Sequence, residues 1–365
     1  MTRLGDRAAP AARPRGGRVP RAWLLLLLPL LLAPLLLRPV RTVEVERRSL
    51  GVLRWGSGAG QVGLYRALDG LWRGPTAVAA DASGRPAVLD AVHQRLLLAT
   101  GAGTTGGGGR SSAAGGGGTG WREVPLPGGG WYTALAPLAD GWLVADGRSG
   151  ALLEVRPALS PNAVRALLAA PDGRETRWRR ILLLRGGPGA TVVLAGEGGT
   201  GFVRRRLWLL EKGRLAAVAE TGIRAPGVEA GGLILSAAPA EQGILLLEGG
   251  ASPLSRQLVR VGPRGPATLF TLELRSPRET VDLLGELPGL GWLLWRALPG
   301  GRATLELRDA SGARSWSASV AAGPPDLLHP AWLEGSRLLL LEPGKEGVRV
   351  EEWIFGARWG LAWRR

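Results

Sequence analysis

Cysteine is absent from the 365-residue chain, which excludes disulfides, thiolate metal sites, cysteine nucleophiles and acylated cysteine anchors. Lys212 and Lys345 are the only lysines and Asn162 is the only asparagine, so arginine supplies 44 of the 46 basic residues. This bias, with abundant Ala, Gly and Pro, is typical of a GC-rich coding sequence. The formal net charge of +16 is therefore weak evidence for a nucleic-acid partner.

Long helical patterns are also missing after residue 41. Short apolar runs of four to six residues are instead interrupted by Gly, Pro and Asp, and the chain holds 58 Gly and 27 Pro. Such runs are typical of short strands separated by tight turns. With 45% hydrophobic and 21% charged residues, the composition rules out a wholly disordered chain. The sequence therefore predicts an all-β protein.

The amino terminus combines a basic segment with an apolar one. Residues 1–21 hold six arginines and one acid, and Ala22–Leu37 is an uninterrupted apolar run. Since no small-residue cleavage site follows the run, we interpret 22–37 as an uncleaved transmembrane signal anchor, with a cleaved signal peptide as the alternative. Basic residues favour the cytoplasmic side, so the predicted topology has a cytoplasmic tip at 1–21, a stem at 38–50 and the remaining chain outside the cell membrane.

Six repeated units follow, each with an apolar strand, a tight turn containing glycine and a second apolar strand. They span residues 76–90, 133–146, 181–197, 233–248, 281–296 and 327–342. Because one or two further strands follow each unit, the pattern predicts a six-bladed β-propeller over 51–365, with 43–68 donating outer strands to the last blade. The Gly-rich stretch at 101–120 is predicted to be a flexible insertion.

The first unit carries a distinctive set of residues: Pro75, Asp81, Gly84, Asp90 and Arg95, with a histidine at position 93. The first five match an NHL repeat in register, so the unit resembles that family, which usually has asparagine where this chain has the histidine. The resemblance implies a six-bladed propeller and says little about activity, because one fold hosts many functions.

Acidic residues end the second strand in five of the six units, at Asp90, Asp146, Glu197, Glu248 and Glu342, with Arg296 in the fifth unit. If these ends surround the mouth of the channel, they form an acidic ring for a cation or a cationic ligand. Our candidate ligand contacts are Asp90, Asp146, Glu248 and Glu342. The alternative is that they accept hydrogen bonds from turn amides or pair with Arg95 or Arg148.

We therefore expect a non-catalytic binding or assembly module without a cofactor, whose partner is a protein or a cell-envelope ligand. A metal-dependent hydrolase of the lactonase or gluconolactonase type is one alternative, although a lone Asn162 cannot complete its usual Glu, Asn and Asp ligand set. A lectin-like propeller is another, because some of the 15 tryptophans could stack on sugars. No G-x-S-x-G motif accompanies His93 or His329. The arginine clusters at 177–180, 204–206 and 364–365 are read as edge protection and not as a nucleic-acid site.

Overall fold

The computed structural model describes residues 37–67, 70, 72–100, 120–147, 150–156, 164–167, 180–187, 190–199, 202–211, 214–224, 233–298, 302–321 and 327–363. These residues form strands, turns and bends, and none of them is helical. No helix capable of crossing a membrane therefore occurs in this part of the chain. The expected tip, the expected anchor apart from Leu37, and the Gly-rich insertion apart from Gly120 lie outside the described residues.

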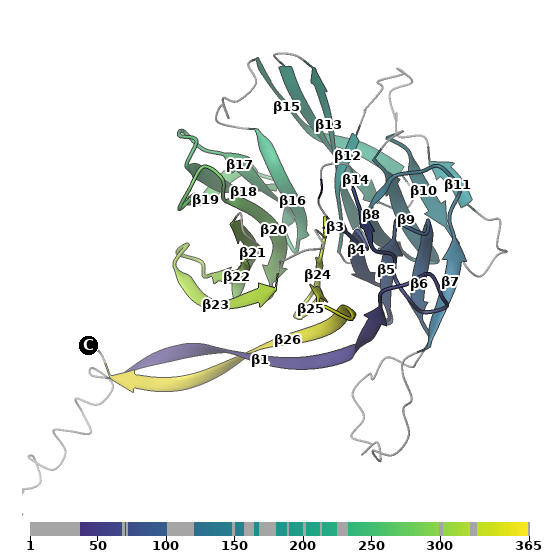
Figure 1. Cartoon of the computed structure of the whole chain (residues 1–365). Coiled ribbons are helices and arrows are strands. Elements are labelled where there is room, and N and C mark those ends of the chain that lie inside the picture. Colours follow the sequence, from purple (N-terminus) through teal and green to yellow (C-terminus); the bar gives the residue numbers. More distant parts are fainter. Residues whose placement is uncertain are drawn as a thin grey trace, which may run out of the picture. The chain divides into compact units, whose positions relative to one another are not determined.

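Six antiparallel sheets of four strands each make up the fold, and they correspond to the six expected blades (Figure 1). The first three are β4 (Ala77–Ala80), β5 (Pro86–Asp90), β6 (Arg95–Ala99) and β7 (Trp121–Pro125); β8 (Tyr132–Leu138), β9 (Gly141–Asp146), β10 (Leu152–Val155) and β11 (Val164–Leu167); and β12 (Arg180–Gly187), β13 (Ala190–Gly199), β14 (Phe202–Glu211) and β15 (Arg214–Arg224). The fourth and fifth are β16 (Ile234–Ala240), β17 (Gly243–Gly249), β18 (Ser255–Gly262) and β19 (Gly265–Glu273); and β20 (Thr280–Leu287), β21 (Gly291–Leu298), β22 (Arg302–Arg308) and β23 (Arg314–Ala321). The sixth contains β24 (Ala331–Glu334), β25 (Arg337–Pro343), β26 (Gly347–Trp363) and β1 (Leu37–Arg54).

The first strands of the blades form a closed ring. Each of β4, β8, β12, β16, β20 and β24 contacts the next, and β24 returns to β4. At that return Ala77 and His329 form an isolated parallel bridge, and the His329 amide donates to the Thr76 carbonyl over 2.8 Å. The six-bladed all-β propeller expected from the repeats is confirmed.

Each repeated unit corresponds to the first hairpin of a blade, as the sequence predicts. The turn of the fifth unit shows why glycine is needed: Gly291 has φ +127°, and a Cβ there would lie 1.9 Å from the Arg308 carbonyl oxygen. Because a backbone carbonyl cannot move aside cheaply, only glycine lets these strands approach so closely.

The amino-terminal strand completes the last blade, also as expected. β1 pairs with β26 as the outermost strand of that sheet, and the Trp55 amide donates to the Glu346 carbonyl over 3.1 Å. Residues 38–50, expected as a stem, all belong to strand β1. The ends of β1 and β26 form a small unit of their own, in which Thr42 Oγ1 donates to the Arg358 carbonyl over 3.2 Å.

One part of the closure prediction is wrong. Within the segment expected to donate outer strands, β2 (Tyr65–Arg66) does not join the sheet of the last blade, because it pairs with β3 (Trp72–Arg73) in a separate two-stranded sheet. Glycines at 56, 58, 60 and 63 interrupt the chain between β1 and β2, which ends the strand and frees this hairpin for another position.

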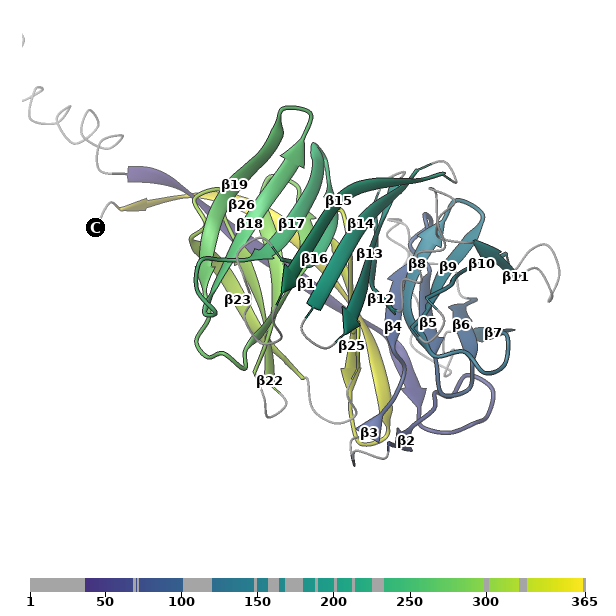
Figure 2. The ribbon, with the colours of Figure 1, turned by 90° about the horizontal axis from the view of Figure 1, so that it is seen from above.

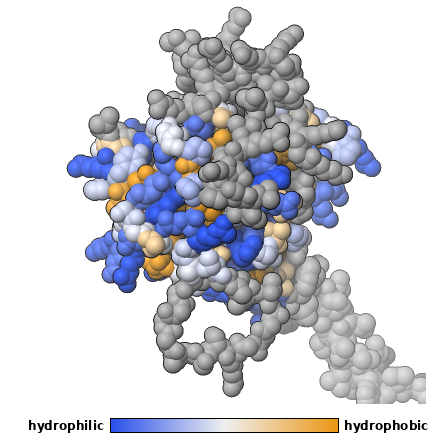
Figure 3. Space-filling model, turned by 90° about the vertical axis from the view of Figure 1, so that its right-hand side faces the viewer, coloured by the Kyte–Doolittle hydropathy of each residue, from blue (hydrophilic) through white to orange (hydrophobic). Residues whose placement is uncertain are grey.

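Burial separates inner from outer strands. Every residue of β4 and β5 is buried, whereas β19 and β23 are mostly exposed or half-buried. Strands packed on both faces read as continuous apolar runs, which explains the Ala, Val and Leu content of the inner hairpins. In Figure 2 the strands of each blade lie side by side. On the face that Figure 3 shows, the coloured residues are mostly hydrophilic, with hydrophobic areas between them.

Candidate functional site

Asp90, the first expected ligand contact, is fully buried and bonded within the protein. Its Oδ2 accepts from His93 Nδ1 over 2.8 Å and from Arg95 Nε over 3.1 Å, and its Oδ1 accepts from the Gly63 amide over 3.2 Å. Arg95 continues the network to Glu123 over 2.8 Å. The carboxylate thus links blade 1 to the segment that precedes it. This arrangement is the alternative given above for Asp90, in which the acid pairs with Arg95 and accepts hydrogen bonds from the backbone.

The three other expected contacts are half-buried and belong to separate blades. Asp146 Oδ1 accepts a hydrogen bond from the Trp131 amide over 2.9 Å. Burial raises the pKa of Glu248. Burial also raises the pKa of Glu342, and Glu351 adds to this effect while Arg349 opposes it. These environments favour the neutral form of two carboxyls, which weakens them as cation ligands.

Metal ligation finds no support in the described ranges, where no three His, Asp or Glu side chains lie close enough together to hold an ion. Arg296, the exception to the acidic pattern, is buried against two acids. Its Nε and Nη2 donate to the two oxygens of Glu279 over 2.8 and 3.0 Å, and its Nη1 lies 3.4 Å from Glu306. The fifth blade therefore holds an internal ion network where the others carry an acid.

A polar cluster that the sequence did not predict connects the first strands of blades 3, 4 and 5 with the start of blade 6. Arg185 Nη2 donates to Asp282 Oδ2 over 2.5 Å and Nη1 donates to the Ala331 carbonyl over 2.8 Å. The Ser236 hydroxyl donates to Asp282 Oδ1. Burial and Arg185 lower the pKa of His329 to about 4, while Asp282 opposes the shift. Because Ser236 donates to the acid and not to a base, the cluster lacks the order of a nucleophilic triad.

Two concave sites lie at opposite ends of the strands. We call the end where β4 begins and β5 ends the entry face, and the end where the first strand of each blade turns into the second the hairpin face. The expected acidic ring belongs to the entry face. Each face carries a cavity of ligand size that is lined by described residues.

The cavity on the entry face is about 550 Å³ and is lined by the side chains of Tyr65, Arg73, Trp131 and Leu328 together with neighbouring loop residues. We call it the aromatic groove. Its apolar side chains are unusually exposed, at 42% for Tyr65, 49% for Trp131 and 51% for Leu328. The β5–β6 loop and the approaches to blades 1, 2 and 6 supply the remaining lining.

The hairpin of β2 and β3 positions the groove's cation between aromatic rings. Tyr65 lies directly opposite Arg73 in the register, so their side chains share a face of the hairpin. The Arg73 guanidinium is 5.6 Å from the centre of the Trp131 ring, within the range of a cation–π contact. Tyr65, Trp72 and Trp131 are exposed aromatic side chains, and all three belong to this hairpin or this groove.

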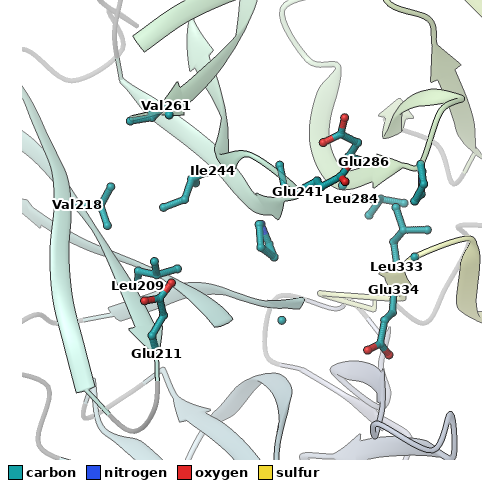
Figure 4. Close-up of a pocket in the computed structure, with 18 of the residues that line it drawn as sticks. Leu209, Glu211, Val218, Glu241, Ile244, Val261, Leu284, Glu286, Leu333 and Glu334 are labelled. Carbon is teal, nitrogen blue, oxygen red and sulfur yellow. The ribbon is translucent and has the colours of Figure 1, made fainter. Parts of the chain in front are cut away.

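The cavity on the hairpin face is about 760 Å³ and opens among blades 3, 4, 5 and 6. Figure 4 shows apolar side chains around an open space with carboxylates at its margin. The apolar lining includes Leu209, Val218, Ile244, Val261, Leu284 and Leu333. Its charged lining, among the described residues, is Glu211, Glu241, Glu286 and Glu334, without a basic side chain. We call it the acidic cavity.

A sequence signal for the acidic cavity existed. An acid also follows or ends the first strand in five of the six units, at Asp81, Asp140, Glu241, Glu286 and Glu334. This second series is as regular as the one at the second strands. Only the folded arrangement distinguishes the two, because it combines three members of the second series with a concave apolar surface.

Comparison with known proteins shows no family for this chain, and the similar solved structures are distant ones. No protein-family model matches the sequence and no curated protein does, so the NHL resemblance is not confirmed. Similar solved structures include a putative gluconolactonase at 11% identity and TM-score 0.46, covering 87% of this chain and 94% of that one. The PQQ-bound aldose sugar dehydrogenase of Streptomyces coelicolor matches at 13% identity and TM-score 0.47, and the match covers 87% of this chain and 100% of that one. The Aleuria aurantia lectin matches at 10% and 0.46, covering 79% and 94%.

Proposed function

We propose that this propeller is a non-catalytic binding module that holds a polypeptide partner in the aromatic groove. The observation that carries the proposal is the clustering of three exposed aromatic side chains, Tyr65, Trp72 and Trp131, at one hairpin and one groove. Tyr, Trp and Arg are the residue types enriched at the energetic centres of protein interfaces. Large rigid rings bury much area at little entropic cost, so a groove of this composition suits a partner segment.

Charge indicates what that segment carries. Arg73 shares a face of the hairpin with Tyr65, and its guanidinium lies 5.6 Å from the centre of the Trp131 ring. A partner that covers the rings therefore meets a positive charge, which favours a carboxylate on the partner by charge complementarity. The favoured partner therefore presents an apolar side chain beside an acidic one.

The same proposal includes placement at a membrane. The arginines of 1–21 and the apolar run at 22–37 support a cytoplasmic tip and a single span, with the propeller outside. Protease treatment of spheroplasts tests this topology: the propeller should be degraded and a small amino-terminal fragment protected. Recovery of the intact full-length chain in the cytoplasmic soluble fraction contradicts it.

A photo-reactive amino acid at Leu328 tests the groove in living cells. We expect a peptide adduct that disappears in a Trp131→Ala background, because the ring is the largest exposed surface there. The matched control is the same probe at Leu254, an exposed leucine of blade 4, which should give no such adduct. Adducts that are identical at both positions, or that carry glycan and no peptide, overturn the proposal, and the glycan result favours the lectin-like alternative.

A further inference from the structure

We propose that the acidic cavity is a second binding site, for a small organic amine with an apolar body. It lies on the hairpin face and is lined by residues of blades 3 to 6, whereas the aromatic groove lies on the entry face around blade 1. The two sites share no lining residue, so an experiment can disprove binding at one site without bearing on the other.

Size and lining point to a small molecule. The volume of about 760 Å³ falls in the ordinary range for small-ligand sites, which are mostly apolar with a few polar groups. Here the apolar side chains come from several blades, so the surface is concave on more than one side (Figure 4). A ligand's hydrocarbon body is buried against Leu209, Ile244 and Val261, with the gain that burial of apolar area brings.

Charge selects the cation. All four charged residues of the described lining are carboxylates, although the chain as a whole has a formal net charge of +16. Carboxylates converging on a concave apolar surface concentrate a negative potential within it. An anionic ligand of the same size meets repulsion there, whereas a protonated amine is attracted.

Glu286 offers a specific acceptor for that amine. Its Oε1 accepts from Arg260 Nη2 over 2.9 Å. Its Oε2 is buried and has no hydrogen-bond partner among the described residues. The side chain as a whole is 24% exposed, so this oxygen can accept from a ligand N–H when the carboxylate turns towards the cavity, and the cost of the unsatisfied acceptor is then recovered.

Glu334 contributes in a different way. Burial raises its pKa, Arg337 opposes the shift and Asp81 adds to it. A bound ammonium stabilises the ionised form, so the two charges favour each other. Glu241 is exposed at the edge of the cavity and supplies a longer-range attraction.

A series of three probes separates charge from apolar contact. We measure binding of 4-phenylbutylamine, 4-phenylbutyrate and n-butylamine to the purified full-length chain by isothermal titration calorimetry at low ionic strength. We expect 4-phenylbutylamine to bind at least about tenfold more tightly than 4-phenylbutyrate or n-butylamine, since only 4-phenylbutylamine supplies both the cation and the apolar body.

Variants assign that binding to the cavity. Glu241→Gln and Glu334→Gln should each weaken 4-phenylbutylamine binding about threefold to tenfold, and Val261→Thr should weaken it through the apolar lining. Asp140→Asn is the matched control, because Asp140 is an exposed acid of the same series that does not line the cavity, and it should bind like the original chain. Unchanged melting temperatures show that the variants remain folded.

Three results overturn the inference. They are equal binding of 4-phenylbutyrate and 4-phenylbutylamine, no detectable binding of the amine at 10 mM, and unaltered affinity in the Glu241→Gln, Glu334→Gln double variant. Loss of the peptide adduct at Leu328 does not bear on this site, and loss of amine binding does not bear on the aromatic groove.

Discussion

Arg185 of blade 3 and Asp282 of blade 5 form an ion pair of 2.5 Å between Nη2 and Oδ2, although a whole blade separates them in the ring. The Arg185 side chain is 4% exposed and that of Asp282 is 32% exposed. Such a pair links blades that are not neighbours, so we expect it to contribute to the cohesion of the inner ring.

Removing one partner of this pair should cost more than removing both. Asp282→Ala leaves a buried guanidinium without its acid, and we expect a loss of about 3 kcal/mol in the free energy of unfolding. In the Arg185→Met, Asp282→Ala double variant the loss should be smaller than in Asp282→Ala alone. Urea unfolding of the two single variants and the double variant measures the coupling. Strictly additive losses contradict an interaction between the blades.

His329 should make the propeller sensitive to mild acid. Its pKa is lowered from 6.5 to about 4 by burial and by Arg185, against the opposing effect of Asp282. Between those values the unfolded chain takes up a proton that the folded chain refuses, so the free energy of unfolding is level above pH 6.5 and falls as the pH falls towards 4. We expect a loss of up to about 3 kcal/mol across this window. Denaturant titrations at pH 7.0, 5.5 and 4.5 measure the slope, which His329→Gln should flatten.

The buried arginine of blade 5 should be irreplaceable by lysine. Arg296 reaches both oxygens of Glu279 with two nitrogens, a geometry that an ammonium cannot reproduce. We expect Arg296→Lys to lower the free energy of unfolding by about 2 kcal/mol. Burial raises the pKa of Glu279, but hydrogen bonds from Arg296 and the Arg275 amide outweigh it, so the net pKa is lowered. The stabilisation from ionised Glu279 is therefore present above pH 4.5, the usual pKa of a glutamate, and is lost as the pH falls further. In the Arg296→Lys variant we expect this acid-dependent loss of stability to be smaller.

Two hairpin glycines allow a direct test of close backbone approach. At Gly291 a Cβ collides with the Arg308 carbonyl oxygen, whereas at Gly335, with φ +56°, no atom lies within 4 Å. Both positions carry the cost of a left-handed backbone, about 1 kcal/mol, so Gly335→Ala should show that cost alone. Gly291→Ala should cost at least about 2 kcal/mol more. Thermal unfolding of the two variants gives the comparison, and similar losses mean that the turn of blade 5 can relax.

Asp90 should behave as a structural residue in contrast to exposed acids. Its carboxylate holds Arg95, His93 and the Gly63 amide, so Asp90→Ala should destabilise the propeller by about 3 kcal/mol. Asp140→Ala, at an exposed turn, should change stability by less than about 0.5 kcal/mol. Melting temperatures of both variants provide the measurement. If Asp90→Ala melts like the original chain, the network around Arg95 does not stabilise blade 1.

The repeats were sufficient to predict the six blades because each blade is built from local hairpins whose apolar runs and turn glycines are visible in sequence. The position of β1 was also predictable, since an amino-terminal strand that pairs with the last sheet closes the ring and covers an otherwise unpaired strand edge. The groove was not, because Tyr65, Trp131 and Leu328 come from three distant segments. The cluster of Arg185, Ser236, Asp282 and His329 was hidden for the same reason. Side chains that come together only when the ring closes are far apart in the sequence, so no regular spacing in the sequence predicts their contact.

The pairing of β1 with β26 sets an order of events during synthesis. β1 leaves the ribosome early, but Gly347, where its partner begins, follows roughly 290 residues later. At about 5–20 residues per second this interval lasts roughly 15–60 s. Throughout it the nascent chain carries an unpaired strand edge, which is open to pairing with other chains. The sheet of the last blade therefore cannot be completed until β26 has been synthesised.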